Sequence, residues 1–113
     1  MTRDERLYLN DILESIEKIQ QYTADLSFEE FVANSMAVDA VVRNLEIIGE
    51  AASHIPDDIL STYSEVPWFE MKGMRNIMAH EYFRVDLKIV WMTIRKSLPA
   101  LVSMIKQVIA ERP

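Results

Sequence analysis

The feature that most constrains this chain is the spacing of its apolar residues, which recur every three or four positions along almost the whole sequence. The first such stripe consists of Leu9, Ile12, Ile16 and Ile19. No segment alternates apolar and polar residues between glycine-containing turns, the pattern typical of strands, and only 2 residues are glycine. We therefore predict an all-α protein. Its 113 residues are the length of one domain, so we predict a single domain over residues 1–113.

Four main helices are expected, packed as an up-and-down bundle with short helical turns between them. They are predicted over approximately residues 4–22, 27–53, 67–80 and 86–108. Ser27 followed by Glu30 is a capping box at the start of the second helix. Gly49 lies inside this helix, where glycine costs about 1 kcal/mol relative to alanine, which is typical of a close crossing between helices. Residues 59–66 are expected to form a turn and a surface connection.

The last two helices contain proline at informative positions. Pro67 suits the first position of the third helix because that position has no backbone hydrogen bond to lose. Pro99 falls inside the fourth helix and predicts a kink, with the apolar stripe kept in register on both sides. Asp86 is the predicted N-cap of that helix.

Composition excludes several classes of protein. The absence of cysteine excludes a disulfide scaffold, a thiolate zinc site and a thiol nucleophile. The two histidines, His54 and His80, are not spaced as a metal-binding pair, so we expect no metal site and no cofactor, and His54 is expected to be structural. Neither an apolar leader nor a stretch long enough to span a membrane is visible, so a cytoplasmic location without membrane contact is expected.

Charge is distributed unevenly along the chain. The net charge is −6, but residues 1–66 hold fourteen acidic and four basic residues, whereas residues 67–113 hold four acidic and eight basic ones. An acidic protein binds nucleic acid weakly through non-specific attraction, so any contact with RNA requires a local basic patch. The C-terminal half is where such a patch is expected.

One segment concentrates reactive side chains, namely residues 75–82 with the pattern R-N-x-x-x-H-E-Y. On a regular helix Arg75 and Tyr82 share one stripe, whereas His80 lies about 140° round the axis from Arg75. These side chains converge only where the helix loosens near His80 or where a second copy supplies the missing group across a two-fold axis. The second possibility predicts a homodimer with shared sites.

Structural roles would also account for these residues. A histidine near the C-terminal end of a helix interacts favourably with the helix dipole, and Arg75 has Glu46, Glu50 and Glu70 as possible ion-pair partners. Tyr82 is equally suited to core packing with its hydroxyl at the surface.

As catalytic groups, these side chains suit cleavage of RNA. Without a thiol or a metal, the nucleophile is the 2′-hydroxyl of the substrate, and the protein supplies proton transfer and charge stabilisation. His80 would be the general acid or base, and Arg75 would pair with the non-bridging oxygens of the transition state. DNA, which lacks this hydroxyl, would not react.

The segment resembles the R-x4-H-x-Y signature of HepT-like toxins, also called the DUF86 family, within the HEPN superfamily of all-α ribonucleases. Blocks at residues 43–51, 67–68, 73–76, 80–83 and 90–91 are also similar to those of the family and stand in the same order. The resemblance covers nearly the whole chain and implies a homodimeric or larger assembly with a cleft at the dimer interface.

By this resemblance the protein is a metal-independent endoribonuclease toxin of a toxin–antitoxin system. Arg75 and His80 would be catalytic, and Asn76 would help to position the substrate. The partner would be a minimal nucleotidyltransferase antitoxin that uses ATP to attach AMP to Tyr82, which adds bulk and negative charge beside the RNA-binding cation. The alternatives are a non-catalytic HEPN module that binds the nucleotidyltransferase, and a helical dimer in which residues 75–82 are only an interface.

Overall fold

A computed structural model describes residues 4–80 and 86–112, and for residues 76–80 it describes the backbone alone. Every regular element in the described ranges is helical, which confirms the predicted all-α class. The elements are α1 (Glu5–Thr23), α2 (Phe28–Ala33), α3 (Ser35–Ala52), α4 (Asp57–Thr62), α5 (Trp68–His80), α6 (Leu87–Met92), a π-helical turn η2 (Thr93–Ser97) and α7 (Leu98–Glu111).

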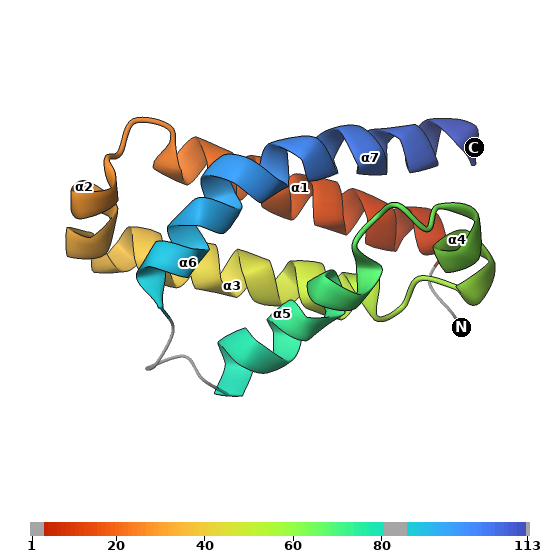
Figure 1. The fold of residues 1–113 in the computed structure, drawn as a ribbon, viewed down its shortest axis with the longest axis horizontal. Coiled ribbons are helices and arrows are strands. Elements are labelled where there is room, and N and C mark those ends of the chain that lie inside the picture. The colour runs from red at the N-terminus through yellow and green to blue at the C-terminus, as the bar shows by residue number, and fades with distance from the viewer. Residues whose placement is uncertain (1–3, 81–85, 113) are drawn as a thin grey trace.

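The long helices α1, α3 and α7 run lengthwise around one apolar core, and the short helices α2 and α4 lie near its opposite ends (Figure 1). α1 packs against α3 and α7, and α3 packs against α5 on its other side. Figure 1 shows α1 and α3 running in opposite directions. The predicted stripe on α1 is fully buried, as are Leu98, Ile105 and Val108 on α7. The helical period therefore identified the core-facing residues of the longest elements correctly.

Local capping explains where several helices begin. Asp4 caps α1 by accepting a hydrogen bond from the Arg6 amide at 2.8 Å. The predicted capping box is present, because Ser27 and Glu30 each accept a hydrogen bond from the other's backbone. Asp86 caps α6 as predicted.

The predicted single helix over residues 27–53 is wrong, because α2 ends at Ala33 and α3 begins at Ser35. Asn34 between them has extended backbone angles, and its side chain accepts a hydrogen bond from the Ala37 amide at 3.0 Å. An asparagine that caps a new helix can interrupt a continuous apolar pattern.

The predicted surface connection over residues 59–66 is also wrong in its first part, where α4 forms. Asp57 and Asp58 occupy the first turn of α4, where negative charge favours a helix, and Ile59 is fully buried.

Two further features lie close to their predictions. The predicted last helix changes direction before α7 (Figure 1), and the π-helical turn η2 ends two residues before Pro99, which lacks the amide hydrogen that a regular helix needs there. On α5, Trp68 and Met71 are buried, whereas Phe69 is 85% exposed.

Candidate functional site

The position of Arg75 is set by a close crossing of α5 over α3. A Cβ atom added to Gly49 of α3 would lie 2.9 Å from the Arg75 Cβ and 2.9 Å from the Met71 carbonyl oxygen, and would also collide with the Arg75 amide nitrogen. Only a residue without a side chain permits this approach. The predicted close crossing at Gly49 is confirmed, and it brings Arg75 next to the residue that follows the glycine.

That residue is Glu50, which holds the guanidinium group of Arg75. The Arg75 Nη1 donates to the Glu50 Oε2 at 3.0 Å and to the Ser53 hydroxyl at 3.4 Å. The two charged side chains are 44% and 55% exposed, so this ion pair is open to solvent and exchangeable. Of the three glutamates considered from the sequence, Glu50 is the partner.

The second carboxylate oxygen of Glu50 extends the network to His54. Glu50 Oε1 lies 3.2 Å from His54 Nε2, and the His54 ring stacks on Tyr8 of α1 with centroids 4.7 Å apart and an interplanar angle of 12°. The hydrogen bond from Arg75, followed by that from His54, lowers the pKa of the Glu50 carboxyl below its usual value of 4.5. Glu50 is therefore ionised at neutral pH and links α1, α3 and α5 through its neighbours.

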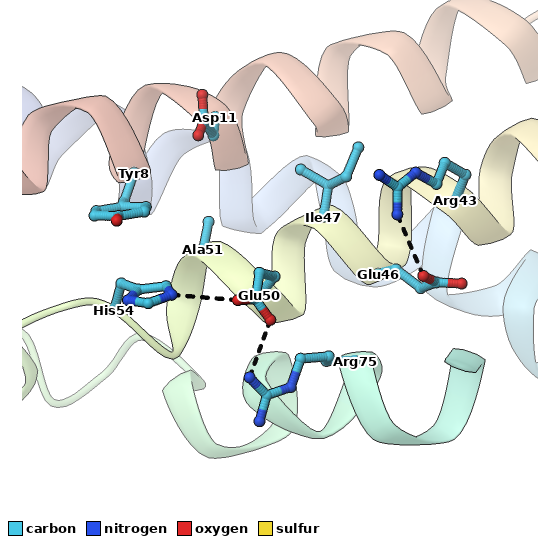
Figure 2. A pocket seen from close by; sticks show the side chains of 9 residues that line it. All are labelled: Tyr8, Asp11, Arg43, Glu46, Ile47, Glu50, Ala51, His54 and Arg75. Carbon is cyan, nitrogen blue, oxygen red and sulfur yellow. Dashed lines mark hydrogen bonds and ion pairs between the residues drawn. The ribbon is translucent and has the colours of Figure 1, made fainter. Parts of the chain in front are cut away.

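These side chains line a surface pocket of about 470 Å³ between α1, α3 and α5, which we call the Arg75 pocket (Figure 2). Its lining residues are Tyr8, Asp11, Arg43, Glu46, Ile47, Glu50, Ala51, His54 and Arg75. The far end holds a second ion pair, in which the Arg43 Nη1 lies 3.4 Å from the Glu46 Oε2. Two guanidinium groups, three carboxylates, an imidazole and a phenol give the pocket the chemistry to bind a polar ligand.

The side chains of Asn76 and His80 and the whole of Tyr82 lie outside the described residues. The backbone of α5 is helical through His80, which places residues 75 and 80 about 140° apart round its axis.

Several pocket residues were not identified as functional from the sequence. His54 was expected to be structural, but it lines the Arg75 pocket. The spacing of Glu50 and His54, four residues apart, was a usable signal because such residues meet on a helix surface. No comparable signal pointed to Tyr8 and Asp11, which come from α1 and reach the pocket only through the packing of α1 on α3.

Neither a candidate metal site nor a membrane-spanning helix is present among the described residues. Residues 4–75 and 86–112, with the side chains described there, contain no group of three or more histidine or acidic side chains that could hold a metal ion. Within the described part of the chain, no helix is both long and apolar enough to cross a bilayer.

Comparison with known proteins shows which family this sequence resembles. The family described as "Ribonuclease HepT-like" matches residues 12–108. A protein of Thermococcus cleftensis named "Probable ribonuclease HepT" is 43% identical over 101 residues, which cover 89% of this chain and 92% of that protein. Proteins named as candidate RNases in Methanocaldococcus jannaschii and Caldanaerobacter subterraneus are each 41% identical, over 88% and 92% of this chain and 91% and 93% of their own lengths. No solved structure matches significantly.

Proposed function

This chain belongs to the HepT-like ribonuclease family, and we propose that it is a metal-independent endoribonuclease acting as the toxin of a toxin–antitoxin pair. The observation that carries the proposal is the setting of Arg75. This residue belongs to the family signature, borders a polar surface pocket and is held by an exchangeable ion pair rather than by a buried one. A cation held in this way is available to an incoming phosphate group.

In the proposed reaction, the 2′-hydroxyl of the RNA attacks the adjacent phosphorus atom and the bond to the 5′-oxygen of the next nucleotide breaks. Arg75 pairs with the non-bridging phosphate oxygens, where negative charge develops in the transition state. His80 transfers the proton as general base or general acid, and Asn76 helps to position the phosphate. No metal ion takes part.

The proposal gives Glu50 a defined place in substrate binding. In the free protein the Glu50 carboxylate accepts a hydrogen bond from the Arg75 guanidinium, and a phosphate of the RNA must displace this carboxylate in order to bind. After displacement the carboxylate keeps His54 as a hydrogen-bond partner, which limits the cost of the exchange.

We further propose that the active assembly is a homodimer. Since the backbone of α5 is helical through His80, positions 75 and 80 of one chain lie about 140° apart round the helix axis, and a second copy would supply the missing group. The exposed Phe69 on the same helix offers apolar surface for such a contact. A cognate nucleotidyltransferase would inactivate the toxin by transferring AMP from ATP to Tyr82, placing negative charge near Arg75.

Substitution of the two proposed catalytic residues tests the nuclease. Arg75→Ala and His80→Ala should each lower the rate of RNA cleavage by at least about 100-fold while the circular dichroism spectrum stays unchanged. Arg6→Ala is the matched control, because Arg6 also pairs with a nearby carboxylate but does not line the Arg75 pocket. A fully active double variant would refute the proposal.

Further measurements test metal independence, the role of the 2′-hydroxyl and the modification of Tyr82 separately. EDTA should leave cleavage unchanged, and RNA with a 2′-deoxy ribose at the cut should resist it. Intact mass spectrometry after incubation with the transferase and ATP should show added AMP on the wild type and none on Tyr82→Phe. A stable complex with the transferase but no cleavage by the wild type would favour the non-catalytic binding module.

A further inference from the structure

The chain has two histidines, and the proposed chemical step uses only His80. We propose that the other, His54, is a positioning residue for RNA binding. It holds the Glu50 carboxylate when a phosphate of the RNA takes the place of that carboxylate on Arg75, and it holds it more strongly when its own ring is protonated. This inference rests on the proposed ribonuclease function and assigns to the same site a regulation by pH.

The Glu50 carboxylate is shared by two donors. The Arg75 Nη1 lies 3.0 Å from Oε2 of Glu50, and the His54 Nε2 lies 3.2 Å from Oε1, so each donor has an oxygen of its own. Because an ionised carboxylate only accepts hydrogen bonds, the Nε2 of His54 carries a hydrogen whether the ring is neutral or charged. Both donors are attracted to one negative charge, so the contact with His54 strengthens when Arg75 leaves.

The His54 ring is held by contacts that do not involve Arg75. His54 directly follows the C-cap of α3, and its backbone amide donates to the Ala51 carbonyl at 3.0 Å. Tyr8 of α1 stacks on the ring, and Figure 2 shows the ring with one nitrogen directed at the Glu50 carboxylate. RNA binding at Arg75 therefore leaves His54 in place, and the displaced carboxylate keeps a fixed donor.

A charge on the His54 ring favours this exchange. Histidine is the side chain that ordinarily gains its charge between about pH 8 and pH 5. The pKa of the Glu50 carboxyl lies below its usual value of 4.5, chiefly because of the hydrogen bond from Arg75, so Glu50 stays ionised throughout this range. A protonated ring attracts Glu50 more strongly and repels the Arg75 guanidinium, and both effects favour the transfer of Arg75 to a phosphate.

Other groups also face the ring from the elements that pack around it. The charged and titratable residues that line the pocket with His54 are Tyr8 and Asp11 from α1, Arg43, Glu46 and Glu50 from α3, and Arg75 from α5. All of these except Glu50 stay the same in the variants compared below. Differences between those variants therefore report on the contact between His54 and Glu50.

The affinity for RNA at two pH values tests the proposal. Fluorescence anisotropy with a 2′-O-methyl oligonucleotide, which the enzyme cannot cleave, would be measured in the His80→Ala background, where His54 is the only histidine. Affinity should rise up to about fivefold from about pH 7.5 to about pH 5.5, the most that an exposed ion pair contributes. His54→Gln keeps a donor but gains no charge, so it should match the parent at the higher pH and lack the rise. His54→Leu should bind about twofold more weakly at the higher pH.

Glu50→Gln in the same background separates positioning from direct attraction. This variant should lose most of the rise, because His54 then has no carboxylate to hold. Glu14→Gln is the matched control, since Glu14 and Lys18 have the same spacing in sequence and the same distance, 3.2 Å, as Glu50 and His54, but lie outside the pocket. It should keep the full rise. Thermal unfolding checks that each variant is folded.

The outcomes distinguish this role from the nuclease itself. An equal rise in Glu50→Gln and its parent would refute the positioning role and show that His54 attracts RNA directly. A rise that survives in His54→Gln would refute any role of His54 in it. Cleavage by the wild type together with binding that does not depend on pH would refute only the positioning role. Absence of cleavage together with a rise that requires Glu50 would refute the nuclease and retain the positioning role.

Discussion

Replacement of Glu50 by glutamine should tighten RNA binding, because it removes the carboxylate that occupies Arg75 in the free protein. The two groups are 3.0 Å apart and about half exposed, and ion pairs of this kind contribute at most about 1 kcal/mol. Freed from this competition, RNA should bind up to about fivefold more tightly. Glutamine keeps an oxygen that can accept the hydrogen bond from Arg75, so the guanidinium should stay in place.

The salt dependence of binding gives a second, independent magnitude. A guanidinium that is no longer neutralised by the protein contributes fully to counterion release, so the plot of log affinity against log salt should become steeper by about 0.7 for single-stranded RNA. Fluorescence anisotropy with a 2′-O-methyl oligonucleotide between about 50 and 200 mM salt measures both quantities.

Asp58→Asn is the matched control for this experiment. Asp58 pairs with Arg112 at the same distance, 3.0 Å, and is 64% exposed, but neither residue lines the Arg75 pocket. Removal of the Asp58 carboxylate changes the net charge of the protein by the same amount as removal of the Glu50 carboxylate. The difference between Glu50→Gln and Asp58→Asn therefore isolates the effect of freeing Arg75. Equal affinities and equal salt slopes in these two variants would refute the displacement of Glu50 by phosphate.

Three further predictions concern stability. Gly49→Ala should lower the free energy of unfolding, measured in urea, by about 1–3 kcal/mol. Backbone atoms of α5 occupy the space that the alanine methyl group would need, and this clash outweighs the gain of about 1 kcal/mol in helix propensity. A variant as stable as the wild type would contradict the close crossing. Arg95→Ala should lower the free energy of unfolding by about 2 kcal/mol, and Arg95→Lys should lower it less. The Arg95 guanidinium donates hydrogen bonds to the carbonyls of Thr23 and Leu26 and lies 4.2 Å from the centre of the Trp91 ring. Unchanged melting temperatures in both variants would argue against these contacts. Because its pKa is lowered, the Glu50 carboxylate contributes to stability above about pH 4.5, and this contribution is lost as the pH falls through the lowered pKa. The free energy of unfolding of the wild type should therefore exceed that of Glu50→Gln by less than about 1 kcal/mol at pH 7 and by nothing at about pH 2. A difference that grows on acidification would show that the assigned sign is wrong.

The helical period predicted much of this fold because it depends only on which residues must be buried. The boundaries that it missed were decided by polar groups. Asn34 is compatible with the surface of a continuous helix, and only the hydrogen bond that it accepts from Ala37 shows that it caps a new one. In α4, the buried Ile59 and its neighbour Leu60 are the two apolar residues of a six-residue helix, which is too short for a helical period to be recognised.

The site was predictable to the extent that its residues are close in sequence. Arg75 lies in a segment dense in reactive groups, and its carboxylate partner was one of three candidates that helix spacing could not separate. Choosing Glu50 required the crossing of α3 and α5. Tyr8 and Asp11 enter the pocket from a helix more than sixty residues earlier than Arg75, and no local pattern marks them.

The adjacency of Gly49 and Glu50 connects the fold to the proposed chemistry. Gly49 allows α5 to approach α3 so closely that the backbone of Arg75 is fixed against it, and the next residue then reaches the guanidinium. Neither residue is assigned a chemical step, yet one sets where the cation lies and the other sets what it binds before RNA arrives. A side chain at position 49 would move Arg75 away from Glu50, so Gly49→Ala should lower cleavage as well as stability. Glu50→Gln, in contrast, should change the affinity for RNA while α3 and α5 remain packed.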